Sequence, residues 1–180
     1  MFVQTEITPN PNSLKFIPGK VVSNNGSFEI TKKDQVNNEL VRNLLSINGV
    51  TGIFLGADFL SVNKEEKKEW EDIKHIVISL INDFYSNGKE FVFDKEIDKE
   101  EKSNFEDIEK KIISILDSKI RPAVAKDGGD IKFKEFKDGI VKVQLQGSCS
   151  GCPSSTMTLK QGVQNLLCHY IPEVKEVIAI

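Results

Sequence analysis

The chain has 180 residues, a formal net charge of −3 and a pI near 5.5. This length suits one full domain or two small ones, and its 39% of hydrophobic and 28% of charged residues are ordinary for a soluble globular protein. The acidic balance provides no global positive field for nucleic acid. No apolar run approaches the ~18 residues that a membrane span needs. We therefore expect a globular protein with neither nucleic-acid nor membrane partners.

The N-terminus and the cysteines bear on the compartment. Residues 1–6 are typical of a strand and lack the basic stretch and apolar core of a secretory signal. The chain is therefore expected to stay where it is made, or to be a form already processed. Its three cysteines are an odd, clustered set that suits no disulfide framework. A reducing compartment is the expected location.

The first half of the chain predicts a small α+β domain, built as a sheet with two helices. Alternating apolar residues and turn signals predict strands over residues 3–7, 14–17, 52–55 and 59–62. Apolar residues at helical spacing predict two helices, one over Val36, Leu40, Val41, Leu44 and Ile47, the other over Ile73, Ile76, Val77, Leu80, Ile81 and Phe84. Gly49 suits a cap for the first helix, and Asn87 with Gly88 ends the second.

A charged segment separates this half from the next. Residues 94–104 contain a single apolar residue, Ile97, among charges of both signs. Such a segment buries almost nothing, so it predicts a linker or a solvated helix entrance, and the domain boundary is placed here. The expected division is therefore a first domain over 1–93, a charged linker over 94–104 and a second domain over 105–180.

The second half predicts the order helix, hairpin, helix, strand. Phe105, Ile108, Ile112, Ile115 and Ile120 mark a helix that is expected to end before Pro122. The turn at residues 127–130 leads into a strand over 131–133, and Asp138-Gly139 predicts a two-residue hairpin. In the returning strand over 140–146, Val141, Val143 and Leu145 are expected to face in. Leu159, Val163, Leu166 and Tyr170 describe another helix, and a last strand starts near Val174.

The turn between the hairpin and the last helix carries the predicted chemistry. Cys149 and Cys152 lie there with two residues between them, a spacing that lets both sulfurs reach one metal or cluster. Thiolates select zinc, copper(I) and iron–sulfur clusters. Pro153 suits the first helical position, so the cysteines would lie at a helix N-terminus, which favours thiolates and anionic ligands.

The number of ligands predicts a shared site. A tetrahedral zinc or a cubane cluster takes about four protein ligands, and this turn offers two. Cys168 lies inside the following helix and is interpreted as a small hydrophobic residue, and His75 and His169 lack ligand spacing. The simplest completion is a symmetric pair of subunits, each giving Cys149 and Cys152 to one exchangeable cluster.

Two other readings of the cysteine pair stay open on the residues alone. One is a dithiol oxidoreductase, because a thioredoxin-like site also places its cysteines at a helix start. The other is a zinc-stapled interaction module. The thioredoxin fold needs a strand-helix-strand unit ahead of further strands, whereas a tight hairpin precedes this turn. That order favours the cluster.

The same residues resemble a known family. Residues 120–124, 127–131, 147–155 and 158–160 closely resemble the C-terminal domain of NifU-like proteins. Residues 8–16, 54–59 and the region of Trp70 resemble the N-terminal domain that accompanies it in the Nfu branch. Together these segments cover nearly the whole chain in the family's order.

The resemblance implies an iron–sulfur cluster assembly and delivery protein rather than an enzyme. It implies a [4Fe–4S] cluster held between two subunits by Cys149 and Cys152, with recipient apo iron–sulfur proteins as partners. The location it implies is the bacterial cytoplasm or, for a processed eukaryotic form, the mitochondrial matrix. The chain lacks the separate scaffold domain of full-length NifU, so it is expected to receive clusters from upstream scaffold proteins and pass them on.

Other polar residues receive structural interpretations. Asp127 and Asp130 are read as parts of a helix-to-strand turn rather than as metal ligands. Arg121 either steers an acidic partner or interacts with the dipole at a helix end. The N-terminal domain shows no catalytic constellation, so a partner-recognition or regulatory role is expected for it. No role is assigned to Cys168.

Overall fold

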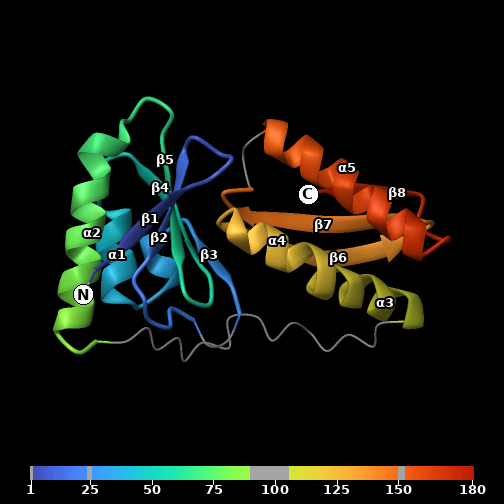
Figure 1. The fold of residues 1–180 in the computed structure, drawn as a ribbon, viewed down its shortest axis with the longest axis horizontal. Coiled ribbons are helices and arrows are strands. Elements are labelled where there is room, and N and C mark those ends of the chain that lie inside the picture. The colour runs from blue at the N-terminus through green and yellow to red at the C-terminus, as the bar shows by residue number, and fades with distance from the viewer. Residues whose placement is uncertain (1, 24–25, 90–105, 150–152) are drawn as a thin grey trace.

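The computed structural model of the chain describes residues 2–23, 26–89, 106–149 and 153–180. It has the predicted α+β fold: two separate sheets, each accompanied by helices (Figure 1). We call residues 2–89 the N-terminal unit and residues 106–180 the C-terminal unit. Each has its own hydrophobic core. The predicted linker over 94–104 lies outside the described residues.

The N-terminal unit is an antiparallel sheet with two helices on one face. Its strands follow the order β1-β2-β5-β4-β3. Their bounds are β1 Gln4–Ile7, β2 Ser13–Ile17, β3 Phe28–Ile30, β4 Val50–Leu55 and β5 Leu60–Lys64. Helices α1 (Glu39–Leu45) and α2 (Trp70–Ser86) cover one face of this sheet, and a short 3-10 turn, Lys33–Gln35, precedes α1 (Figure 1).

Alternation along the strands explains this packing. The residues that point toward the helices are apolar and form one core with them: Leu14, Phe16, Ile53, Leu55, Leu60 and Val62 from the strands, and Leu40, Leu44, Val77 and Ile81 from the helices. The next residues along β2 and β5 point to the opposite face because strand side chains alternate. They include Lys15, Ser61 and Asn63. The sheet therefore has one apolar face and one largely polar face.

The sequence predictions for this half hold with several corrections. Ile76 on α2 is 47% exposed and so lies outside its buried stripe, and Ile47 follows the end of α1. Helix α2 ends before Gly88, whose φ of +69° stops it as expected. The short strand β3 was not predicted. Helix α1 begins only at Glu39, so Val36 precedes it. Ile7 does not contribute to a buried strand face: it is 90% exposed, because β1 is an edge strand of the sheet.

The C-terminal unit combines a hairpin, a parallel third strand and helices. Its sheet has the order β6-β7-β8, with β6 antiparallel and β8 parallel to β7. The strands are β6 Gly129–Lys137, β7 Ile140–Gly147 and β8 Glu176–Ala179. The hairpin predicted at Asp138-Gly139 is confirmed, since both residues have the positive φ, 53° and 79°, that this turn requires. Val141, Val143 and Leu145 are buried as predicted.

The first helix of this unit continues past Pro122, so the predicted end is wrong. Helix α3 (Asp107–Ile115) passes through a π-helical turn, Leu116–Ile120, into α4 (Arg121–Lys126). Pro122 has no N–H to donate, and the chain accommodates it with a wider turn in which the Arg121 N–H donates to the Leu116 carbonyl. Pro122 then lies at the start of α4, where proline is tolerated.

The last helix buries a slightly different stripe from the predicted one. In α5 (Pro153–Tyr170), Val163 and Leu167 are fully buried, whereas Leu166 is half-buried and Tyr170 is exposed. Cys168 packs beside this core, and its thiol donates to the Val174 carbonyl at 3.2 Å, in keeping with a structural role. Among the helices in the described residues, none is both long and apolar enough to cross a membrane.

Candidate functional site

The predicted cysteine turn lies at the end of the C-terminal unit that faces the N-terminal unit (Figure 1). Strand β7 ends at Gly147 and helix α5 begins at Pro153, so Cys149 lies on the strand-to-helix connection. Cys149 is buried, with 7% of its surface exposed. Cys152 lies outside the described residues. We call residues 147–149 the cysteine turn.

A second turn, residues 127–129, packs against the cysteine turn, and we call it the glycine turn. Gly129 pairs with Gly147 in the β6–β7 ladder. The Ser148 N–H donates to the Gly128 carbonyl at 3.2 Å, and the Ser148 hydroxyl donates to the Asp127 carbonyl. A Cβ atom on Gly129 would lie 2.8 Å from the Cys149 sulfur. Only glycine at the start of β6 therefore leaves room for the sulfur in this position. The two turns therefore form one compact unit around Cys149.

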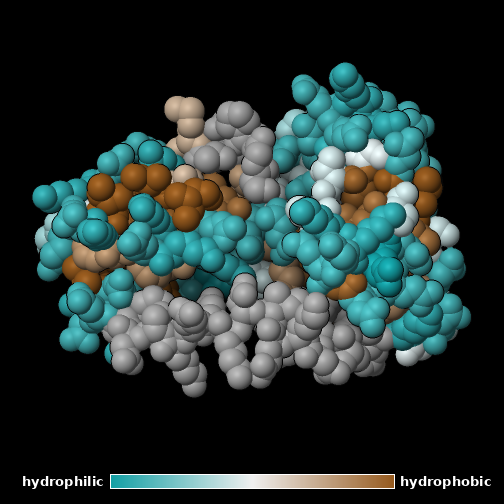
Figure 2. Space-filling view, turned by 180° about the vertical axis from the view of Figure 1, so that it is seen from behind, coloured by the Kyte–Doolittle hydropathy of each residue, from teal (hydrophilic) through white to brown (hydrophobic). Residues whose placement is uncertain are grey.

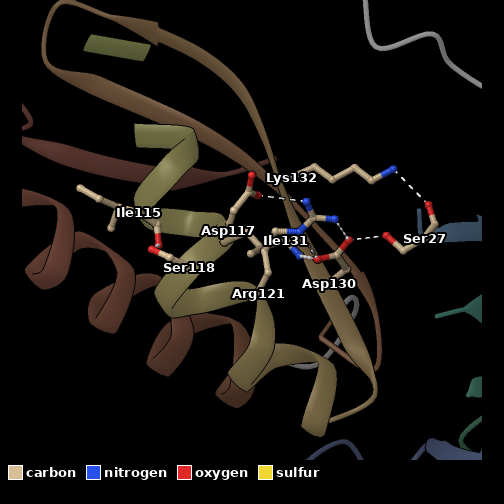
Figure 3. Close-up of polar contacts among 8 residues, drawn as sticks. All are labelled: Ser27, Ile115, Asp117, Ser118, Arg121, Asp130, Ile131 and Lys132. Atoms are coloured by element: carbon tan, nitrogen blue, oxygen red, sulfur yellow. Dashed lines mark hydrogen bonds and ion pairs between the residues drawn. The ribbon is translucent and has the colours of Figure 1, made fainter. Parts of the chain in front are cut away.

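An ion pair fixes the glycine turn to helix α4. Arg121 donates through Nε and Nη2 to the two carboxylate oxygens of Asp130, both at 2.9 Å, and through Nη1 to Asp117 at 3.0 Å (Figure 3). The hydrogen bond to Asp130 raises the pKa of the Arg121 guanidinium above its ordinary value, although burial opposes this. The pair with Asp130 therefore favours the charged form of Arg121. Asp130 directly follows Gly129, so the pair holds the start of β6 in place.

These contacts sharpen the sequence interpretation of the acidic residues. Asp130 is occupied by Arg121 and by the hydroxyl of Ser27, a residue of the N-terminal unit (Figure 3). Within the part of the chain that the structure describes, no three His, Cys, Asp or Glu side chains converge in a way that could hold a metal ion. Arg121 therefore does more than interact with the dipole of its helix end, since it pairs with Asp130. The sequence did not predict this ion pair because Arg121 lies on α4 and Asp130 on β6.

The cysteine turn fits a soft, anionic iron–sulfur group. Cys149 offers a thiol four residues ahead of helix α5, and the N-terminal end of a helix favours negatively charged groups. Gly147, with a φ of +66°, lets the main chain come close to whatever the sulfur holds. A group that takes about four thiolates needs further ligands beyond Cys149.

The N-terminal unit contacts this site directly, which no sequence pattern indicated. Asn10 donates from Nδ2 to the Ser148 carbonyl at 3.1 Å, and the Ser61 hydroxyl donates to the Gly128 carbonyl at 2.7 Å. A pocket of about 410 Å³ lies beside these contacts, lined from one unit by Phe54 and Phe59 and from the other by Arg121. The site is therefore built from both units.

Comparison with known proteins places both units in one family. Residues 112–178 match the family model described as NifU-like domain, and residues 3–88 match that described as Scaffold protein Nfu/NifU N terminal. A human relative named "NFU1 iron-sulfur cluster scaffold homolog, mitochondrial" is 46% identical over 180 residues, covering 98% of this chain and 71% of the relative. The chain belongs to the Nfu family of NifU-like proteins. The resemblance expected from the sequence is thereby confirmed for both halves.

Other relatives of this Nfu-family chain agree with the assignment. A Drosophila erecta protein with the same printed name is 43% identical over 181 residues, and "NifU-like protein 4, mitochondrial" of Arabidopsis thaliana is 40% identical over 184. The chain spans 64% and 65% of their lengths. Among solved structures, a NifU-like protein from Saccharomyces cerevisiae is 27% identical with a TM-score of 0.48, covering 53% of this chain and 87% of that one.

Proposed function

We propose that this protein carries an iron–sulfur cluster and delivers it to other proteins, the cluster being its cargo. The observation that carries the proposal is the position of Cys149, in the strand-to-helix turn of a unit that matches the NifU-like domain. The printed names of the human and Drosophila erecta relatives, iron–sulfur cluster scaffold homologs, support it. The protein then acts by binding and transfer, and not as an enzyme.

We further propose that the cluster is a [4Fe–4S] cluster shared by two subunits. Each subunit supplies Cys149 and Cys152, which gives the four thiolates that such a cluster takes. The positive N-terminal end of helix α5 would favour an anionic cluster held by these cysteines. The partners are then a second copy of the chain in the loaded form, upstream scaffold proteins that donate the cluster, and recipient apo iron–sulfur proteins.

The division of the chain follows the same proposal. We place an Nfu-type domain over 1–93, a charged linker over 94–104 and a NifU-like cluster-binding domain over 105–180. The separate family matches over 3–88 and 112–178, and the separate hydrophobic cores, support these bounds.

As for location, the named relatives are mitochondrial, which favours the mitochondrial matrix. These named relatives lend no support to the bacterial cytoplasm.

Anaerobic reconstitution tests the proposal. The chain incubated with iron and sulfide should become coloured, bind about two irons per chain and restore activity to a recipient apo-enzyme. Cys149→Ser and Cys152→Ser should each abolish both results, whereas Cys168→Ser, the matched control, should retain them. A normal cluster in either of the first two variants would contradict the assignment. Reduction of a disulfide substrate without iron would favour the dithiol enzyme, and stoichiometric zinc in anaerobically purified protein would favour the zinc module.

A further inference from the structure

The polar face of the N-terminal sheet is buried along its inner strands β2 and β5, although neither helix of its own unit covers it. Ser61 on β5 is fully buried and Ser13 on β2 is 2% exposed. Their neighbours along the strands, Leu60 and Leu14, point to the helices on the other face. Figure 1 shows the C-terminal unit lying against this open face, with the end of β7 toward it. The cover over the polar face is therefore the end of the C-terminal unit that bears Cys149.

Side chains of the N-terminal unit bind the main chain around Cys149. Their amide, hydroxyl and ammonium groups all donate to carbonyl oxygens within residues 126–128 and 147–148. The four hydrogen bonds are Lys15 to Lys126 at 3.4 Å, Ser61 to Gly128 at 2.7 Å, Asn63 to Gly147 at 3.4 Å and Asn10 to Ser148 at 3.1 Å. Because the acceptors are main-chain atoms, this surface recognises the shape of the two turns rather than their side chains.

Glycines make this close approach possible. A Cβ atom on Gly147 would lie 2.9 Å from the ring of Phe54, and one on Gly128 would lie 2.8 Å from the Ser61 hydroxyl. Both glycines also have positive φ, +66° and +81°. The backbone of the turns therefore touches the sheet face directly, with Phe54 as an apolar contact in the middle of polar ones.

Charged side chains of each unit bind main-chain groups of the other unit at this contact. The Lys15 ammonium meets the last carbonyl of α4, the negative end of that helix, and lies 4.6 Å from the centre of the Phe59 ring. Glu29 accepts a hydrogen bond from the Gly147 N–H at 3.3 Å. Lys132 of the C-terminal unit donates back to the Ser27 carbonyl at 3.2 Å (Figure 3).

The contact between the two units also has features that allow the units to separate. Among the described residues, the buried Ser13 hydroxyl and the Asn63 amide oxygen on this face lack a hydrogen-bond partner. Such groups gain hydration when two surfaces separate. On the face drawn in Figure 2, hydrophobic residues gather over each unit and the surface between them is mostly hydrophilic. Polar interfaces between domains of one chain are typically movable.

We propose that the N-terminal unit is a reversible cap on the cysteine turn. Docked, its polar sheet face binds the carbonyls around Cys149 and keeps that thiol out of reach; undocked, it exposes the turn. The purpose of opening rests on the proposed function: a turn covered by the cap cannot face a second subunit, so sharing a cluster requires release. Docking of the cap on the cysteine turn requires no bound iron, so it can be tested on the iron-free chain.

Alkylation of a single thiol tests the cap. In a full-length chain carrying Cys152→Ser and Cys168→Ser, N-ethylmaleimide reports on Cys149 alone, and the rate follows the open fraction when opening is fast. Adding Ser61→Arg places a large charge at the centre of the contact. The alkylation rate should rise by about tenfold or more, and X-ray scattering should give a larger radius of gyration.

The matched control is Ser79→Arg, on the exposed surface of α2, which packs on the opposite face of the sheet. It should leave both the alkylation rate and the radius of gyration unchanged. Asn10→Ala, which removes one of the four hydrogen bonds, should accelerate alkylation by a smaller factor. Circular dichroism verifies that each variant is folded.

Two results would overturn the cap. Ser61→Arg could leave the alkylation rate unchanged although scattering reports separated units, which would mean that the C-terminal unit alone protects Cys149. Alternatively, neither observable could change in Ser61→Arg and Asn10→Ala. Failure of the proposed function has a different signature: a chain that alkylates as described here but never takes up iron and sulfide contradicts the carrier role and leaves the cap intact.

Discussion

The two faces of the N-terminal sheet show how one sheet serves two purposes. The face toward α1 and α2 is packed with apolar side chains such as Phe16, Leu60 and Val62, and burying them drives the folding of the unit. The face toward the cysteine turn is also largely covered, yet it carries Lys15, the fully buried Ser61 and the half-buried Asn63. A largely apolar contact between domains tends to be permanent, whereas the groups of a polar one can exchange their partners for water. The apolar face therefore stabilises the N-terminal unit, and the polar face controls access to Cys149.

The largest expected effect comes from breaking the apolar face. Phe16→Ala removes a fully buried ring and should destabilise the N-terminal unit by about 3–5 kcal/mol, because a cavity remains where the ring packed. Urea unfolding followed by circular dichroism measures this loss. Ser61→Ala on the adjacent strand should cost only about 1 kcal/mol, the net value of one hydrogen bond. Equal losses for the two variants would contradict the distinction between the faces.

Gly147→Ala should have the next largest effect. Its Cβ atom would lie 2.6 Å from the Gly128 carbonyl oxygen and 2.9 Å from Phe54, at a φ of +66° that alanine rarely adopts. A cost of about 1–3 kcal/mol in the free energy of unfolding is expected. The matched control is Gly162→Ala in helix α5, where a Cβ atom has open space, and it should stabilise by about 0.5–1 kcal/mol. Opposite signs for two identical substitutions would support the close approach of the turns.

Arg121→Lys tests the support behind the glycine turn. Lysine keeps the charge but loses the two-pronged hydrogen bond to Asp130, because an ammonium cannot match both carboxylate oxygens. Since Arg121 is 36% exposed, water replaces part of the loss, and about 1 kcal/mol is expected. Amide hydrogen exchange at Gly129 and Ile131 should accelerate in the same variant. Unchanged exchange there would show that the ion pair does not hold the start of β6.

The smallest effect should come from Lys15→Met. Methionine keeps the apolar stem beneath the ammonium but removes the hydrogen bond to the Lys126 carbonyl and the ion pair with Glu6 at 3.3 Å. Stability should fall by about 0.5 kcal/mol. Alkylation of Cys149 should accelerate by a few fold. An unchanged alkylation rate would show that Lys15 does not help to hold the cap on the cysteine turn.

Regular periodicity made most of this fold predictable. The long apolar stripe of α2, the Asp138-Gly139 hairpin and the alternation in β7 were all predicted, because each follows from a local repeat or a turn preference. The three residues of β3 were too few to show a period. The helix end expected before Pro122 was wrong because a single π turn accommodates the missing N–H.

The site was predictable in its chemistry but not in its surroundings. The position of Cys149 between a strand and a helix followed from the sequence. The turn predicted over 127–130 is shorter in the structure, because β6 begins at Gly129 and includes Asp130. The contact between the units could not be foreseen, since polar residues alternating with apolar ones along β2 and β5 are typical of a strand with a solvated face. Only the tertiary structure pairs Ser61 with Gly128 and Arg121 with Asp130.

Native mass spectrometry of the oxygen-free, iron-loaded chain tests the central claim most directly. The account predicts one species of two chains with four irons and four sulfides, which is lost in Cys149→Ser and retained in Cys168→Ser. A loaded species containing a single chain, with no external thiol to complete the ligand set, would contradict it.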